Sequence, residues 1–273
     1  MPRLTCIMLA LMLMSATPAT AQVSTNARVS NLAANAAIGA TLTAARQVFG
    51  RHKFMRPIVL GALGGAIQGA GRQVAAGRST ASGFIGREVS ALGISATYSA
   101  GADSLVLIAP VWLVTFEVRP HQQDRFRARV NLMDLAFVTS AFIDGRSLDV
   151  GSSLVAGAPV FTRPVARTDV AAGYTRMGVI FLLNGTALRR EILSHEAVHL
   201  LQWDAYNQLV ANPIERTLVR GVPGGGSLSR FLDLGVLSPT SALLLAQQIP
   251  YDRQPWEREA YLLTTGRPTA GPH

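Results

Sequence analysis

The chain has 273 residues, of which 49% are hydrophobic. This length suffices for one domain whose core needs no disulfide bonds for its stability. The formal net charge is +9, but every basic residue except Lys53 is arginine, and no recognition helix, zinc finger or aromatic platform accompanies the charge. We therefore exclude nucleic acid from the expected partners.

Residues 1–21 have the pattern of an export signal. An apolar run over residues 4–14 follows a basic residue, and the small residues that end at Ala21 fit a cleavage site. The run is short for a bilayer span, so a retained membrane anchor is the less favoured alternative. We expect an exported protein, periplasmic or secreted. The single cysteine, Cys6, lies in this signal, so any metal ligands of the mature chain are His, Asp or Glu.

Residues 22–100 are predicted to be helical and rich in glycine and alanine, with helices near residues 31–49, 57–77 and 83–95. In the second of these helices Gly61, Gly65 and Gly69 recur every four residues. Such spacing leaves a flat seam on one helix face, which another backbone can approach closely. We expect a buried or interfacial helix here, and membrane insertion is the minority alternative.

The same N-terminal segment carries eight basic residues against one acidic residue, Glu88. Residues 46–87 hold most of these charges, which permits a peripheral contact with an anionic membrane surface. A solvated basic face is the favoured interpretation, because charge runs are usually exposed to water.

Residues 101–185 are predicted to form an antiparallel sheet of about four strands. The strand-like runs are rich in β-branched and aromatic residues, and Pro110 indicates a bulge or a sheet edge. Asp144-Gly145 lies between two such runs and predicts a type I′ hairpin. The runs cover residues 104–118, 125–143, 147–161 and 174–185.

Residues 186–266 are predicted to be helical. Thr186 can cap a helix that Asn212-Pro213 would end, and a Gly-rich loop follows. Ser238-Pro239 and Pro255 each predict a further helix start, and Gly266 predicts the end of the last helix. The predicted fold is therefore α+β: an N-terminal helical part, an antiparallel sheet and C-terminal helices.

The first of these C-terminal helices contains the sequence His-Glu-Ala-Val-His at residues 195–199. His195 and His199 are four residues apart, so they share one helix face and both imidazoles can reach one metal ion. Glu196 is one step further round the helix, where it can contact a metal-bound water. Two buried histidines bonded to backbone carbonyls are the alternative interpretation.

A hydrolytic zinc site needs a third protein ligand. His52, His121 and His273 lack suitable spacing, so we expect a carboxylate from a later helix. Glu257 and Glu259 lie in "QPWEREAYLL", about 200° apart on a helix, so only one of them can face the metal. A glutamate in a first helical turn is also favourable without any metal.

"HEAVH" followed by "WEREAY" resembles the gluzincin class of zinc metallopeptidases over roughly residues 179–263. The resemblance implies a zincin-like domain over residues 22–273, with zinc held by His195, His199 and Glu257. Gln202 also matches bacterial proteins with the pattern His-Glu-x-x-His-x-x-Gln. Tyr261 stands where the class often has an aspartate that orients a ligand histidine.

These residues predict hydrolysis of a peptide or protein substrate by a zinc-activated water, with Glu196 as the general base. The resemblance further implies that the strand at residues 178–183 lines the cleft and pairs with the substrate. A non-catalytic envelope-associated protein with a structural or degenerate metal site is the alternative. The candidates for stabilising the oxyanion are Tyr206, Tyr251, Tyr261 and Arg253.

Overall fold

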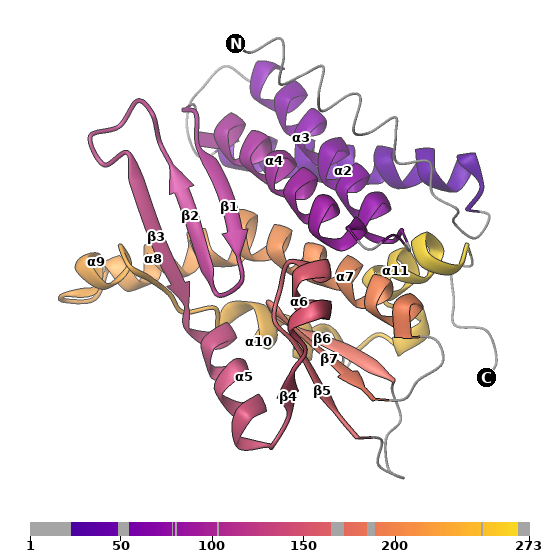
Figure 1. Ribbon diagram of the computed structural model, residues 1–273. Helices are drawn as coiled ribbons and strands as arrows, with labels where there is room; N and C mark the ends of the chain where they lie inside the picture. Colours follow the sequence, from indigo (N-terminus) through magenta and orange to yellow (C-terminus); the bar gives the residue numbers. More distant parts are fainter. Residues whose placement is uncertain are drawn as a thin grey trace.

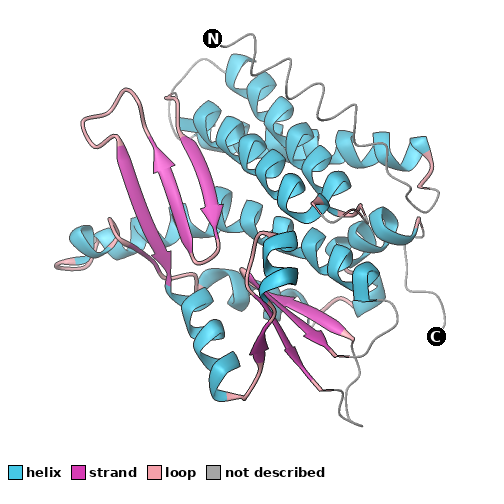
Figure 2. Cartoon of the chain, in the orientation of Figure 1, coloured by secondary structure: helices cyan, strands magenta, loops and turns pink. Residues whose placement is uncertain are grey.

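The computed structural model describes residues 23–48, 55–77, 79, 81–102, 104–164, 172–184, 189–246 and 248–266. Over these residues the chain is an α+β protein with two sheets of four strands each (Figures 1 and 2). The predicted fold class is therefore confirmed. The predicted export signal and the Thr186 cap lie outside the described residues.

Three helices form the N-terminal part: α2 (Thr25–Val48), α3 (Met55–Ala75) and α4 (Ser82–Ala102). They pack beside one another on one side of the molecule (Figure 1). The third predicted helix was too short, because its pattern of small residues continues to residue 102. In the described part of the chain, none of the helices combines the length and the hydropathy that crossing a membrane requires.

The predicted glycine seam is confirmed at the contact between α2 and α3. A Cβ atom at Gly61 would overlap the Thr43 side chain, and one at Gly65 would overlap the carbonyl oxygen of Asn35. The neighbouring Gly64 makes an equally close approach to Thr97 of α4. The helices can approach this closely because α3 lacks side chains on both faces.

We expect Gly65→Ala to lower the free energy of unfolding by about 2–3 kcal/mol, because an added methyl group forces two closely packed helices apart. Gly151→Ala makes the same chemical change in a short helix where the new atom meets only ordinary contacts. It should be neutral or slightly stabilising, since alanine is the better helix former. Denaturant unfolding measures both, and equal stabilities of the two variants would show that the α2–α3 contact is loose.

The first sheet has the strand order β1-β2-β3-β8. Its strands are β1 (Leu107–Val111), β2 (Val114–Val118), β3 (Phe126–Asn131) and β8 (Leu232–Asp233). The first three pair antiparallel, and β8 adds parallel to β3. Pro110 lies on β1, the edge strand, as predicted.

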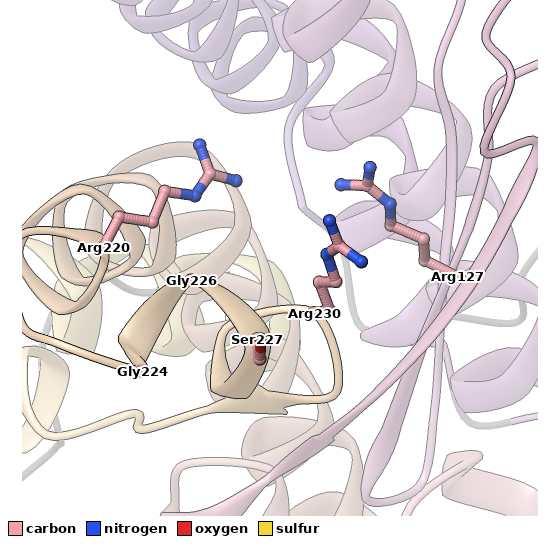
Figure 3. A pocket seen from close by; sticks show the side chains of 6 residues that line it. All are labelled: Arg127, Arg220, Gly224, Gly226, Ser227 and Arg230. Carbon is pink, nitrogen blue, oxygen red and sulfur yellow. The ribbon is translucent and has the colours of Figure 1, made fainter.

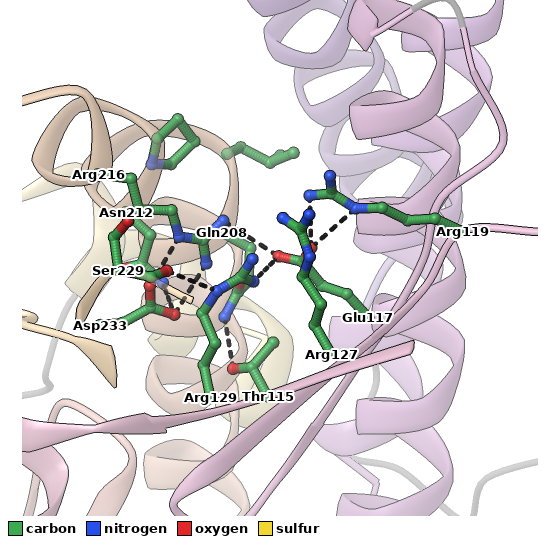
Figure 4. A network of polar contacts seen from close by, with 12 residues as sticks. Thr115, Glu117, Arg119, Arg127, Arg129, Gln208, Asn212, Arg216, Ser229 and Asp233 are labelled. Carbon is green, nitrogen blue, oxygen red and sulfur yellow. Dashed lines mark hydrogen bonds and ion pairs between the residues drawn. The ribbon is translucent and has the colours of Figure 1, made fainter. Parts of the chain in front are cut away.

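On β3 the buried face carries a charged residue and the exposed face an aromatic one, which is the reverse of a usual amphipathic strand. Phe126 on β3 is 59% exposed, whereas Arg129 on the same strand is completely buried. Glu117 of β2 accepts hydrogen bonds from Arg129 and from Arg216 of the C-terminal part, and Arg216 also pairs with Asp233 (Figure 4). This network of charges joins β2 and β3 to the helices behind the sheet, while Ile108 of β1 makes apolar contacts there with Ile94 and Leu209.

The predicted antiparallel strand over residues 125–143 is wrong beyond residue 131, where helix α5 (Leu132–Ile143) begins. The side chain of Asn131 caps this helix by accepting a hydrogen bond from the amide of Asp134. Asp144-Gly145 is not a type I′ hairpin. Gly145 has a φ of 69° and ends the helix, and the bonds Gly145 N to Phe142 O and Arg146 N to Ala141 O form a Schellman motif.

The predicted single antiparallel sheet is also wrong, because a second sheet with the order β4-β5-β7-β6 follows α5. Strands β5 and β7 pair parallel, while β4 and β6 pair antiparallel with their neighbours. The parallel pair arises because β6 comes between β5 and β7 in the chain but pairs on the far side of β7. The run at residues 147–161, which was predicted to be one strand, is divided by a helix into β4 and β5. The elements are β4 (Ser147–Leu148), α6 (Val150–Ala156), β5 (Val160–Arg163), β6 (Gly173–Arg176) and β7 (Val179–Leu183).

The long C-terminal helix was predicted to end at Asn212-Pro213, and this prediction is wrong, because the helix continues past Pro213. Helix α7 (Arg189–Tyr206) continues through a π-helical segment, η1 (Asn207–Ala211), into α8 (Asn212–Arg220). Pro213 lacks the N–H that would bond to the carbonyl of Leu209 in a regular α-helix. Arg46 of α2 donates to that carbonyl oxygen instead, at 2.6 Å, so the helix passes the proline without an unsatisfied acceptor.

The remaining elements are α9 (Gly225–Leu228), α10 (Leu237–Ala246), η2 (Tyr251–Arg253) and α11 (Pro255–Thr265). The predicted start of the last helix at Pro255 and its end at Gly266 are confirmed. Ala197, Leu200 and Leu201 of α7 pack on the second sheet against Ile180 and Leu182. The opposite side of α7 contacts α11, so the metal-binding motif lies between the sheet and the last helix.

Candidate metal centre

Helices α7 and α11 bring the predicted ligands together. Val198 of α7 packs in a small apolar cluster with Ala260 and Leu263 of α11. This contact fixes the two helices so that His195, His199 and Glu257 meet beside it. Pro255 at the first position of α11 places Glu257 in the first turn, at the end of the helix that faces α7.

The three donor atoms form a compact triangle. His195 Nε2 lies 3.1 Å from His199 Nε2, and Glu257 Oε2 lies 3.2 Å from His199 Nε2 and 3.5 Å from His195 Nε2. A tetrahedral zinc ion with ligands at about 2.0–2.1 Å places its ligand atoms about 3.3 Å apart. The triangle therefore matches the spacing of three zinc ligands, and two imidazoles with one carboxylate are a donor set that zinc accepts.

Glu257, and not Glu259, lies beside the imidazoles. Glu259 turns to the other side of α11, where it pairs with Arg72 at 3.2 Å and accepts hydrogen bonds from Asn31 and Asn35. Of the two carboxylates that the sequence left open, the structure thus places that of Glu257 within 3.5 Å of both imidazoles.

Gln202 links the imidazoles to the Glu259 group. Its side-chain oxygen lies 2.8 Å from Nδ1 of His199, and its nitrogen donates to Glu259 at 2.8 Å. If His199 Nδ1 carries the proton and donates it to Gln202, Nε2 presents its lone pair to the metal position. A chain of contacts thus runs from His199 through Gln202 and Glu259 to Arg72 of α3, and it orients the ligand histidine.

Glu196 lies against the second sheet. Its carboxylate accepts a hydrogen bond of 2.8 Å from the hydroxyl of Thr175 on β6. The same hydroxyl also contacts the backbone carbonyl of Glu196 at 3.0 Å. Burial raises the pKa of Glu196, while the nearby imidazoles of His199 and His195 lower it, and burial prevails. A carboxyl group with a raised pKa is suited to accept a proton and later return it.

The electrostatics of the cluster favour one bound cation. Burial acts to raise the pKa of Glu257, but hydrogen bonds from His195 and His199 lower it to about 2. Burial acts to lower the pKa of His199, but the bond to Glu257 and the neighbouring carboxylates raise it to about 9. The carboxylates thus hold a positive charge at this position at neutral pH, and a divalent metal would compete with the proton of His199.

The candidate oxyanion-stabilising residues lie in different places. Tyr251, on η2, is 56% exposed and hydrogen-bonded to Glu257, which together with burial raises its pKa. The ring of Tyr261 packs on the imidazole of His195 with 4.5 Å between centroids. Tyr206 is held elsewhere by Ser241, at 3.0 Å, and Arg253 is exposed. Tyr251 is therefore the candidate best placed to contact a bound substrate.

The strand at residues 178–183 was predicted to pair with the substrate, but β6, and not this strand, lies at the edge of the second sheet beside α7. Strand β7, at residues 179–183, pairs on one side with β5 and on the other with β6, so it has no edge for a substrate. The turn at Met177-Gly178, where Met177 has a φ of 55°, folds the predicted single strand into a hairpin. Strand β6 forms the sheet edge and carries Thr175, the partner of Glu196.

Sequence analysis missed several residues that support the site. Thr175 and Asn35 have no local signal, since each acts on a residue far along the chain. Arg72 and Arg87 were counted with the surface charges of residues 46–87, yet both are buried in ion pairs, with Glu259 and Asp204. These two arginines do not face a membrane. The small residues around them on α3 and α4 were the sequence feature that could have indicated the burial of these two arginines.

The chain matches no family model, no curated protein and no solved structure.

Proposed function

We propose that the chain is an exported, zinc-dependent peptidase with a zincin-like domain. The observation that carries the proposal is the triangle of donor atoms from His195, His199 and Glu257, with edges of 3.1–3.5 Å, next to the buried carboxyl group of Glu196. Three protein ligands leave a fourth tetrahedral position for water, which is the arrangement of catalytic rather than structural zinc.

Glu196 takes the central chemical role in this proposal. Bound zinc would lower the pKa of a coordinated water and polarise the scissile carbonyl. Thr175 holds one oxygen of Glu196 and leaves the other free to accept the proton of the water. Glu196 then returns this proton to the amine that leaves. The hydroxyl of Tyr251 donates to Glu257 in this structure, and in the proposed mechanism it would turn from Glu257 to donate to the carbonyl oxygen as that oxygen gains charge.

A peptide or protein substrate has an available edge on β6. Within the described residues this strand pairs on one side only, with β7. An extended peptide that adds to β6 would pass Thr175 and therefore Glu196. The edge thus supports a substrate in extended conformation, whose backbone hydrogen bonds rather than one deep side-chain pocket provide most of the affinity.

The alternative is a non-catalytic protein with a structural metal site. The environment of Glu196 argues against it, because a structural site gains nothing from a buried carboxyl group beside its ligands. Glu117 and Glu259 are buried in pairs with arginines, whereas among the described residues the Glu196 carboxylate accepts a hydrogen bond only from Thr175, and a functional role accounts for the cost of its burial.

The proposal is tested by the metal content and peptidase activity of the purified mature protein. We expect one zinc per chain by elemental analysis and cleavage of a broad peptide library. His199→Ala should remove both. His121→Ala removes an exposed histidine outside the cluster and should change neither. Zinc bound without cleavage of any peptide would favour the structural-site alternative, and absence of zinc from the wild-type chain would refute the proposal.

A further inference from the structure

A cavity of about 510 Å³ lies between strand β3 and the loop that follows α8. None of its lining residues belongs to the metal cluster; they are Arg127, Arg220, Gly224, Gly226, Ser227 and Arg230. In Figure 3 the guanidinium groups of Arg127 and Arg230 lie side by side, and that of Arg220 lies across the opening from them. Three cationic groups from separate segments thus converge on one space.

The carboxylates near this cavity are already engaged. Residues 107–131 and 212–235 hold seven arginines against four acidic residues. Asp124 pairs with Arg127, Glu117 with Arg119, Arg129 and Arg216, and Asp233 with Arg216, while Glu215 accepts from the amides of Gly235 and Leu237. Figure 4 shows this adjoining network. Within the described residues, no carboxylate pairs with Arg220 or Arg230.

Arg220 and Arg230 face one cavity without a carboxylate partner among the described residues, so they repel one another and raise the local positive potential. Glu117 and Asp233 are buried in the adjoining network, so these two acids are not available to neutralise the positive charge in the cavity. An anion in the cavity would remove the repulsion and gain charge-assisted hydrogen bonds. The arrangement therefore favours an external anionic ligand over an internal partner.

We propose that this cavity binds a phosphate group. The planar fork of arginine matches the oxygens of phosphate with two parallel hydrogen bonds, and Ser227 adds a hydroxyl donor to the lining. The loop also leaves room at its backbone, since a Cβ atom at Gly224 or Gly226 would meet no other atom within 4 Å. The phosphate belongs either to a soluble phosphorylated compound or to a lipid headgroup, and both present the same chemistry to the arginines.

The test uses two probes and three variants of the full mature chain. Pyrophosphate binding is measured by calorimetry, and vesicle binding by sedimentation with phosphatidylcholine alone or mixed with phosphatidic acid. Arg220→Gln and Arg230→Gln each remove one cavity donor, and because both side chains are exposed the fold should be retained. Arg258→Gln is the matched control, since it removes an exposed arginine of α11, outside the cavity and outside residues 46–87, and changes the net charge equally.

We expect each cavity variant to weaken binding about tenfold or more and the control to leave it unchanged. Arginine-dependent binding of pyrophosphate supports a soluble ligand, and arginine-dependent binding only of vesicles with phosphatidic acid supports a lipid headgroup. Binding of neither probe, or an equal loss in the Arg258→Gln variant, overturns the proposal. None of these outcomes depends on zinc or on peptidase activity, so the two proposals are tested separately.

Discussion

Glu196→Gln is expected to lower peptide cleavage about a thousandfold while leaving zinc bound, because a general base contributes about 10²–10⁴ to the rate. Glutamine has the shape of glutamate and can still accept the hydrogen bond from Thr175, so the fold around the site should persist. Glutamine does not take up a proton from water near neutral pH, so the rate of the chemical step should fall while zinc binding is retained. Zinc content and kcat on a peptide identified from the library measure the two effects.

Glu88→Gln is the control for this substitution, since it removes an exposed carboxylate on α4 that has no part in the site. It should leave both zinc and cleavage unchanged. Loss of zinc together with activity in Glu196→Gln would mean that Glu196 holds the metal rather than the proton. Unchanged cleavage would exclude Glu196 as the base and leave the mechanism without a proton acceptor.

The meeting of His195, His199 and Glu257 was largely predictable from the sequence because its signals are local. A spacing of four on a helix fixes His195 and His199 on one face whatever surrounds them. Pro255 fixes the start of α11 and therefore the position of Glu257 in its first turn. The choice between Glu257 and Glu259 was not local, since the tertiary contacts of Glu259 with Asn31, Asn35 and Arg72 decide it.

The sheets were harder to predict because hydrophobic runs suit both strands and helices. The run at residues 132–143 has apolar residues at nearly every position, so it shows neither a period of two nor a period of 3.6 clearly. Gly145 in the left-handed conformation ends a helix as readily as it makes a hairpin turn. The local sequence could not distinguish these two uses of the same dipeptide.

Strand β3 and the end of α7 show how distant partners override local pattern. Arg129 is buried because Glu117 and Ser229 accept its hydrogen bonds, and neither partner is recognisable from the alternation of β3. The helix passes Pro213 because Arg46, far along the chain, bonds to the Leu209 carbonyl. Both features depend on a polar contact with another element, which no local period of the sequence encodes.

Glu257→Ala should weaken zinc binding several hundredfold, the second large effect that we expect. Apparent zinc affinities of about 10–16 kcal/mol, shared among four ligands, give roughly 2.5–4 kcal/mol for each. The variant should also lose cleavage, because two imidazoles alone do not hold the ion in a fixed geometry. Competition with a chromogenic chelator measures the affinity, and circular dichroism shows whether the helices remain folded.

Glu259→Gln is the matched comparison, because it alters the neighbouring carboxylate on the same helix. The new side-chain NH2 group would face the NH2 group that Gln202 now donates to Glu259. Loss of this hydrogen bond would loosen the orientation of His199, which Gln202 also contacts. We expect zinc binding to weaken only about 10–100-fold, as for residues that orient a ligand, and the free energy of unfolding to fall by about 2 kcal/mol as the contact with Arg72 weakens. If Glu259→Gln weakened zinc more than Glu257→Ala did, the assignment of the two carboxylates would be reversed. The contrast between them therefore separates a ligand from the residue that supports it, on two positions of one helix that lie about 200° apart round its axis.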